Sequence, residues 1–267
     1  MKILIRGAGD IATGIALRLY RAGMQVVMTD LPAPTAIRRT VCFSQAIILG
    51  EMTVEDVTAR RAETPDQAEA LLAQRLIPVL ADPDCTCRTH LRPDALVDAI
   101  LAKRNLGTKI DDAPIVVGIG PGFTAGEDCH AVVETMRGHT LGRVIYRGSA
   151  LPNTNIPGLI GGYAGERVLR APAEGIFCQK LEIGAVVRAG DIAGEVAGQP
   201  MRCTIDGVLR GILADGTPVF RGMKAGDVDP RCKPEYCTTA SDKALAVGGG
   251  VLEAVLHLHH QHPKTGK

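Results

Sequence analysis

The sequence predicts an α/β protein with a Rossmann-like parallel sheet and a C-terminal β-rich barrel-sandwich region of the lipoyl/biotinyl type. One observation is a strand, a glycine turn, a helix and a second strand that follow one another near the N-terminus. The other is an internal repeat of short strands in the C-terminal third. We expect a Rossmann-like nucleotide-binding domain over 1–150 and the barrel-sandwich region over 151–230. A helix that packs back over 231–256 and a flexible histidine-rich tail over 257–267 complete the expected organisation.

Composition excludes several classes of protein. The chain has 267 residues, 46% of them hydrophobic, which is enough for one large core or two modest ones. Thirty Lys and Arg balance 29 Asp and Glu, and aromatic residues make up 3%, so no nucleic-acid surface is expected. No apolar run approaches the ~20 residues of a membrane helix, and no secretory leader pattern is present. We expect a cytoplasmic protein with reduced thiols that binds neither nucleic acid nor membrane.

The first glycine turn follows an apolar strand over residues 3–5. Gly7, Gly9 and Ala12 match the pattern G-x-G-x-x-A. The first glycine makes the turn, the second lets a pyrophosphate approach the backbone, and the small third residue lets the helix pack closely on the strand. Residues 11–22 then repeat apolar side chains at helical spacing.

Two carboxylates accompany this turn. A second strand over residues 25–29 ends at Asp30, which lies 21 residues after Gly9. That is where a carboxylate that binds a ribose is expected. Asp10 lies in the turn itself, so its charge must point away from any bound pyrophosphate.

Two adjacent arginines, Arg38 and Arg39, follow in a proline-rich loop over residues 31–40. One interpretation is an anion clamp for a phosphate at the carboxyl edge of the sheet. The other is a solvated loop whose arginines pair with surface acids. The sequence does not decide between them.

A second glycine loop follows an apolar strand over residues 115–119. Gly120 and Gly122 lie in this loop, and they face the first turn across a ligand crevice if both loops share one sheet edge. Gly-Pro-Gly is also an ordinary turn. Between the two glycine loops, residues 93–103 have the apolar spacing of a helix.

The cysteines of the middle region do not have the spacing of a metal site. Cys85 and Cys87 form C-x-C rather than C-x-x-C, and no second pair follows at zinc-ribbon distance. We therefore predict no metal and interpret these residues as small buried side chains.

The C-terminal repeat pairs residues 174–196 with 206–228 at an offset of 32, without gaps. Carrier domains of the lipoyl type present a modifiable lysine on the hairpin between such halves, and the hairpin over 197–203 has none. This excludes a swinging-arm carrier and favours a binding surface or an interface. Further on, a closing helix over 244–258 contains three consecutive glycines, which indicate close approach by a ligand or another element.

Six segments together resemble one known family. They are GAGDIATG, LPAPTAIRRTV, VVGIGPGFTAG, VVETMRGHTLGRVI, PNTNIPGLIGGYAGERVLRAP and SDKALAVGGGVLEAVL. They resemble the YqeB family of selenium-dependent molybdenum hydroxylase system proteins, over residues 1–256. The resemblance implies a cytosolic bacterial accessory protein whose partners are a selenium-dependent molybdenum hydroxylase or its cofactor-assembly proteins. It implies no reaction and no catalytic residue.

Three functions remain open at this point. The leading hypothesis is a maturation factor that binds a nucleotide-containing cofactor, either molybdopterin dinucleotide or NAD(P), with the first glycine turn at the phosphates. The second is an NAD(P)-dependent oxidoreductase, for which His130 and His139 are the candidate proton donors. The third is a docking module for the hydroxylase with no ligand in its sheet. A homodimer is the default expectation for the assembly.

Overall fold

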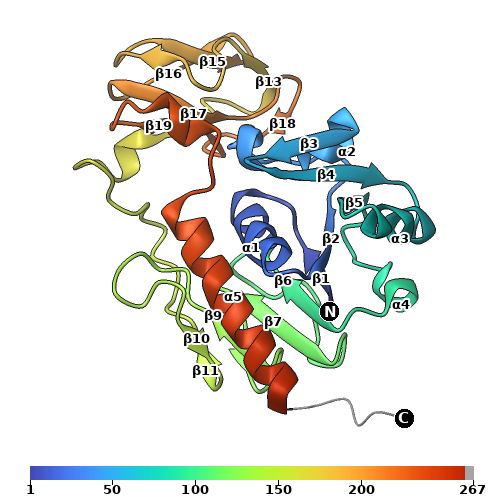
Figure 1. Ribbon diagram of the computed structural model, residues 1–267. Coiled ribbons are helices and arrows are strands. Elements are labelled where there is room, and N and C mark those ends of the chain that lie inside the picture. The colour runs from blue at the N-terminus through green and yellow to red at the C-terminus, as the bar shows by residue number, and fades with distance from the viewer. Residues whose placement is uncertain (262–267) are drawn as a thin grey trace. The chain divides into compact units, whose positions relative to one another are not determined.

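The computed structural model describes residues 1–261 and divides into two compact units (Figure 1). Unit 1 contains residues 1–34, 43–153 and the described residues from 240 onward. Unit 2 contains residues 35–42 and 154–239. Each unit has its own cluster of buried apolar side chains, so each is described by itself.

Unit 1 is built on a nine-stranded sheet. Its strands are β1 (Lys2–Arg6), β2 (Gln25–Asp30), β3 (Glu51–Val54), β4 (Val57–Ala62), β5 (Ile77–Ala81), β6 (Ala95–Asp98), β7 (Ile115–Ile119), β9 (Ala131–Val133) and β10 (Val144–Ile145). They lie in the order β10-β9-β7-β6-β1-β2-β5-β4-β3. Strands from β9 to β4 pair in parallel, while β10 and β3 pair antiparallel at the two edges. A separate pair is formed by β8 (Thr124–Ala125) and β11 (Gly148–Ser149).

Five α-helices belong to this unit. They are α1 (Asp10–Arg21), α2 (Gln45–Leu49), α3 (Pro65–Ala73), α4 (Arg88–Leu91) and α5 (Asp242–Gln261). The predicted first strand, turn, helix and second strand are all present as β1, α1 and β2. Within residues 1–261, no helix combines the length and the apolar character needed to cross a membrane. Of the tail predicted over 257–267, residues up to Gln261 are helical and the rest lie outside the described residues.

Helix α5, red in Figure 1, packs on α1, blue, and glycines lie at this contact. A Cβ added to Gly14 would lie 2.5 Å from the Cβ of Ala244, and one added to Gly248 would lie 2.8 Å from the carbonyl oxygen of Gly14. Gly250 packs closely on the backbone of Gly142. Two of the three consecutive glycines in α5 therefore allow another element of the protein to approach.

The fold class predicted for the N-terminal region is wrong. The sheet is mixed rather than a parallel Rossmann-like sheet, because β3 and β10 add antiparallel pairs at its edges. No helix connects β6 to β7, and the helix predicted over 93–103 is absent. Four of those residues form the fully buried strand β6. A short apolar run does not by itself separate a buried strand from a helix.

Unit 2 contains eight strands in two four-stranded antiparallel sheets. They are β12 (Val168–Arg170), β13 (Gly175–Gln179), β14 (Val186–Val187), β15 (Ile192–Val196), β16 (Gln199–Arg202), β17 (Gly207–Ile212), β18 (Pro218–Val219) and β19 (Lys224–Asp229). One sheet has the order β12-β19-β17-β14 and the other β16-β15-β13-β18. The short 3-10 helices η1 (Arg39–Val41), η2 (Gly165–Arg167) and η3 (Pro234–Cys237) complete the unit.

The internal repeat is visible in this pairing, yet the predicted lipoyl/biotinyl-like barrel-sandwich is wrong as the fold class. Each half of the repeat gives a short strand to the other, because β14 pairs with β17 and β18 pairs with β13. Both sheets are completed by strands outside the repeat, β12 and β16. Residues 35–42 add a further segment, which passes close to Gly211. The repeat specified strands and turns but not the elements that complete the sheets.

Candidate functional site

The polar groups of unit 1 gather where its parallel strands end. Strands β1, β2, β5, β6, β7 and β9 run in parallel, so the turns that follow them lie at one edge of the sheet. Two features lie at this edge. One is a group of residues around the start of α1, which we name the turn site: Gly7, Gly9, Asp10, Asp30 and Lys243. The other is a cavity beside Arg6.

The two glycines of the first turn have different surroundings. Gly7 has φ +105°, donates its N–H to the carbonyl of Thr29 at 2.8 Å, and would place a Cβ 2.9 Å from the backbone of Ala99. The fold itself therefore requires glycine there. Gly9 has φ −75° as the N-cap of α1, and nothing lies within 4 Å of a Cβ added to it. Packing does not require Gly9 to be glycine, and the space in front of it is open.

Asp30 lies beside this turn, as the sequence predicted. Its carboxylate oxygens accept the backbone N–H groups of Ala8 and Leu31, both at 2.7 Å. Burial raises the pKa of Asp30, and the two backbone hydrogen bonds oppose that rise. Ala12, the third residue of the pattern, is buried in α1. The structure thus brings Asp30 together with Gly9.

Lys243, at the start of α5, is a residue of the turn site that sequence reasoning missed. Burial, followed by the positive charge of Arg137, lowers the pKa of Lys243, and the carboxylates of Asp10 and Glu134 oppose this. These interactions bring the predicted Asp10 near a cation. No local motif marks Lys243, because only the packing of α5 on α1 delivers it to this edge.

Glu134 directly follows β9 and is 2% exposed. Its carboxylate accepts the N–H groups of Thr135 and Met136 at 2.7 Å and of Leu151 at 2.8 Å. Glu134 therefore connects the loop that follows β9 to the backbone at Leu151. This structural role adds to the effect of its charge on Lys243.

The second glycine loop is turned toward the protein. Gly120 and Gly122 have φ +75° and +112°. An added Cβ would lie 2.6 Å from Oγ1 of Thr135 at Gly120, and 2.6 Å from the backbone of Arg104 at Gly122. Packing accounts for both glycines, and their predicted contact with a cofactor stays a prediction.

Arg38 and Arg39, the predicted anion clamp, belong to unit 2, and both donate hydrogen bonds within it. Arg38 is 7% exposed and donates to the carbonyl of Tyr236 at 2.8 Å. Arg39 donates to the carbonyl of Ile212 at 3.0 Å and to Oε1 of Gln179 at 2.8 Å, and burial lowers its pKa. Both side chains fix the segment 35–42 within unit 2. Their role as an anion clamp stays a prediction.

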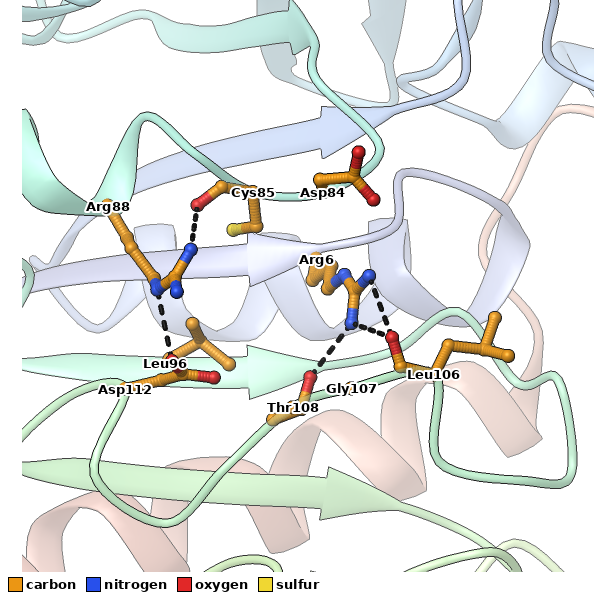
Figure 2. Close-up of a pocket in the computed structure, with 9 residues that line it drawn as sticks. All are labelled: Arg6, Asp84, Cys85, Arg88, Leu96, Leu106, Gly107, Thr108 and Asp112. Atoms are coloured by element: carbon orange, nitrogen blue, oxygen red, sulfur yellow. Dashed lines mark hydrogen bonds and ion pairs between the residues drawn. The ribbon is translucent and has the colours of Figure 1, made fainter.

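The cavity beside the turn site has a volume of about 140 Å³ (Figure 2). It is lined by Arg6, Asp84, Cys85, Arg88, Leu96, Leu106, Gly107, Thr108 and Asp112. Arg6 donates to the carbonyl of Pro83 at 3.1 Å, to Oγ1 of Thr108 at 3.0 Å and to the carbonyl of Leu106 at 3.2 Å. The loops that contain Pro83 and residues 106–108 therefore fix the guanidinium group of Arg6. The wall of the cavity is polar.

The absence of a metal and the role of His130 and His139 as proton donors both stay predictions. Within residues 1–261, no three His, Cys, Asp or Glu side chains come together to hold a metal ion. His130 accepts the backbone N–H of Val116 through Nδ1 at 3.0 Å, so it supports the start of β7.

Comparison with known proteins identifies one curated relative. No protein-family model matches the sequence. Over 265 residues, 99% of this chain, the sequence is 51% identical to the uncharacterized protein YqeB of Escherichia coli K12. The chain is therefore a relative of YqeB, as its motifs predicted, and it spans about half the length of that protein, 49%. YqeB has no assigned activity, so the predicted link to selenium-dependent molybdenum hydroxylases stays a hypothesis.

Solved structures give only weak likenesses. An aspartoacylase family protein from Mesorhizobium loti is 11% identical, with 55% of this chain and 59% of that chain covered and a TM-score of 0.24. A succinylglutamate desuccinylase from a Silicibacter species is 12% identical, with 85% and 84% covered and a TM-score of 0.25. Likeness at this level carries no inference about the activity of this chain.

Proposed function

We propose that unit 1 binds a nucleotide-containing cofactor at the turn site, with the phosphates in front of Gly9. The supporting observation is the contrast between the two glycines of the turn. The fold requires Gly7, because a side chain there would meet Ala99. No described residue lies within 4 Å of a Cβ added to Gly9, where the backbone faces open space at the start of a 12-residue helix.

The charges around Gly9 suit a phosphate. The first N–H groups of α1 have no partner within the helix, and its dipole favours an anion at this end. Lys243 supplies a positive charge that offsets the nearby carboxylate of Asp10. Each carboxylate oxygen of Asp30 accepts one backbone N–H. Each keeps a lone pair that a ribose hydroxyl can donate to.

The biological role we propose is that of an accessory factor for selenium-dependent molybdenum hydroxylases. The support is the resemblance of the six sequence segments, since YqeB itself is uncharacterized. The cofactor is then a molybdopterin dinucleotide or NAD(P), and the partner is the hydroxylase or a protein that assembles its cofactor.

The test is native mass spectrometry of the chain purified gently from its own host, compared with a Gly9→Asp variant. Aspartate is a good N-cap, so the variant is expected to keep its unfolding midpoint. The new carboxylate repels a phosphate, so a retained nucleotide is expected to be lost. Gly249→Ala is the matched control, because an added Cβ there also meets nothing within 4 Å.

Each outcome decides between the hypotheses. A pterin-dinucleotide mass that disappears in Gly9→Asp supports the accessory role. An NAD(P) mass that disappears supports the turn site and favours the oxidoreductase alternative. A nucleotide that remains bound to Gly9→Asp removes the turn site from the proposal. A protein that stays bare after both ligands are offered overturns cofactor binding and favours the docking module.

A further inference from the structure

Cys85 lies in a loop that its neighbours hold in an unusual conformation. The loop follows β5, and Asp82 accepts the N–H groups of Cys85, through its carbonyl at 3.0 Å, and of Cys87, through its carboxylate at 2.8 Å. Cys85 has φ +56°, in the left-handed region that non-glycine residues rarely adopt. Arg88 donates to its carbonyl at 3.1 Å. Such strain persists only where the surroundings fix it, and it is concentrated at functional sites.

The side chain of Cys85 belongs to the buried core of unit 1 and lines the cavity at its edge. Cys85 lines the cavity of about 140 Å³, and Figure 2 shows its sulfur in the space between Arg88 and Arg6 in that view. The residue is 2% exposed, so only a small reagent that enters the cavity reaches the sulfur. Cys87 is also buried and lies two residues further along the same loop.

The surroundings shift the pKa values of the two thiols in opposite directions. A hydrogen bond from Cys87, then the Thr29 hydroxyl and the charge of Arg6, lower the pKa of Cys85, while burial and Asp82 oppose this. Cys87, as the donor, has its pKa raised. One sulfur is therefore suited to attack and the other to remain protonated.

The Thr29 hydroxyl, one of the groups that lower the pKa of Cys85, is itself buried. Thr29, on β2, is 0% exposed, and its Oγ1 has no hydrogen-bond partner among the described residues. An unsatisfied buried hydroxyl costs free energy. A thiolate at Cys85 gives that hydroxyl an acceptor.

We propose that Cys85 and Cys87 form a dithiol site that exchanges with small disulfides entering the cavity. The Cys85 thiolate attacks one sulfur of the disulfide, forms a mixed disulfide and releases the other half as a thiolate. Cys87 gives its proton to that thiolate and attacks the sulfur of Cys85. The Cys85–Cys87 bond forms and the second half leaves as a thiolate. The protein loses two electrons and the small disulfide gains them. The proposal does not rest on the nucleotide site.

The first experiment exposes the folded chain to 2-hydroxyethyl disulfide near neutral pH, then traps free thiols and maps the modified cysteines by mass spectrometry. Wild-type protein is expected to lose two hydrogens in the peptide that contains both cysteines. Cys87→Ser is expected to stop at an adduct on Cys85, and Cys85→Ser to react at Cys87 at least tenfold more slowly. Cys129→Ser is the matched control, because Cys129 is a buried thiol of the same core whose pKa burial raises to about 11.

The second experiment measures the alkylation rate of Cys85 by iodoacetamide against pH. The midpoint is expected below that of an ordinary cysteine and is expected to rise in Thr29→Val, which removes the hydroxyl but keeps the shape. A purely structural role for Thr29 would leave that midpoint unchanged. Reaction of Cys85 no faster than Cys129, or no adduct on Cys85 in Cys87→Ser, would overturn the proposal.

Discussion

The buried carboxylate of Asp227 in unit 2 and the polar groups at the sheet edge of unit 1 differ in the partners that they have. Asp227 is 1% exposed and accepts from Arg210 at 2.9 Å and from Arg167 at 2.5 Å. In unit 1, burial lowers the pKa of Lys243, and the buried hydroxyl of Thr29 has no hydrogen-bond partner among the described residues. A buried carboxylate paired with two arginines holds a fold together, whereas a group left short of partners at a sheet edge is a candidate for binding or chemistry.

Asp227→Ala is expected to have the largest effect. It leaves the buried Arg167 and Arg210 without their shared carboxylate, which costs about 3–5 kcal/mol of unfolding free energy. Urea unfolding measures the loss. Glu51→Ala, which breaks an exposed pair with Arg60, is the control and is expected to cost about 1 kcal/mol or less. Equal losses would remove the contrast between the units.

Arg38→Met tests whether that side chain serves structure alone. The variant loses hydrogen bonds to the carbonyls of Tyr236 and Thr239, so a loss of about 1–3 kcal/mol is expected. Any retained nucleotide is expected to remain bound, since the guanidinium group already donates to the carbonyls of Tyr236 and Thr239. Thermal unfolding and native mass spectrometry on one sample measure both quantities. Loss of the nucleotide from a folded variant would restore the anion clamp.

Gly14→Ala tests how closely α1 and α5 pack against each other. The new methyl group would lie 2.5 Å from the Cβ of Ala244, and overpacking of this kind costs about 1–3 kcal/mol. Gly249→Ala adds the same methyl group in open space, so a gain of up to about 1 kcal/mol is expected there. The unfolding midpoint is expected to fall in Gly14→Ala and to rise in Gly249→Ala. A shift of both midpoints in the same direction would contradict the glycine contact between α1 and α5.

Lys243→Met is expected to have the smallest effect on stability, a change below about 1 kcal/mol. Burial lowers the pKa of Lys243, so the unfolded state binds more protons between the folded pKa and the ordinary value of 10.5. Wild-type stability therefore rises with pH in that window, and the variant is expected to lose this rise. Unfolding midpoints at several alkaline pH values measure it. A loss of several kcal/mol at neutral pH would show instead that Lys243 is structural.

Local chemistry made part of this structure predictable. The strand, glycine turn, helix and second strand follow from residues close in sequence, so Gly9 and Asp30 were found together. Lys243 was missed because it reaches the site only through the long-range packing of α5. The hydrogen bonds of Arg38 within unit 2 were not foreseen, because adjacency to Asp30 in sequence does not show which unit a segment joins. Cys85 was judged only by metal spacing, and neither its left-handed backbone nor its place in the wall of the cavity is readable from sequence.

The interleaving of the units also sets an order for synthesis. Ribosomes deliver the whole of unit 2 by residue 239, before α5 exists. Until α5 emerges, the glycine face of α1 has no partner in the nascent chain. Unit 1 therefore starts first and is completed last. Stalling of translation before residue 242 would leave unit 1 without α5, with the glycine face of α1 uncovered and open to a chaperone.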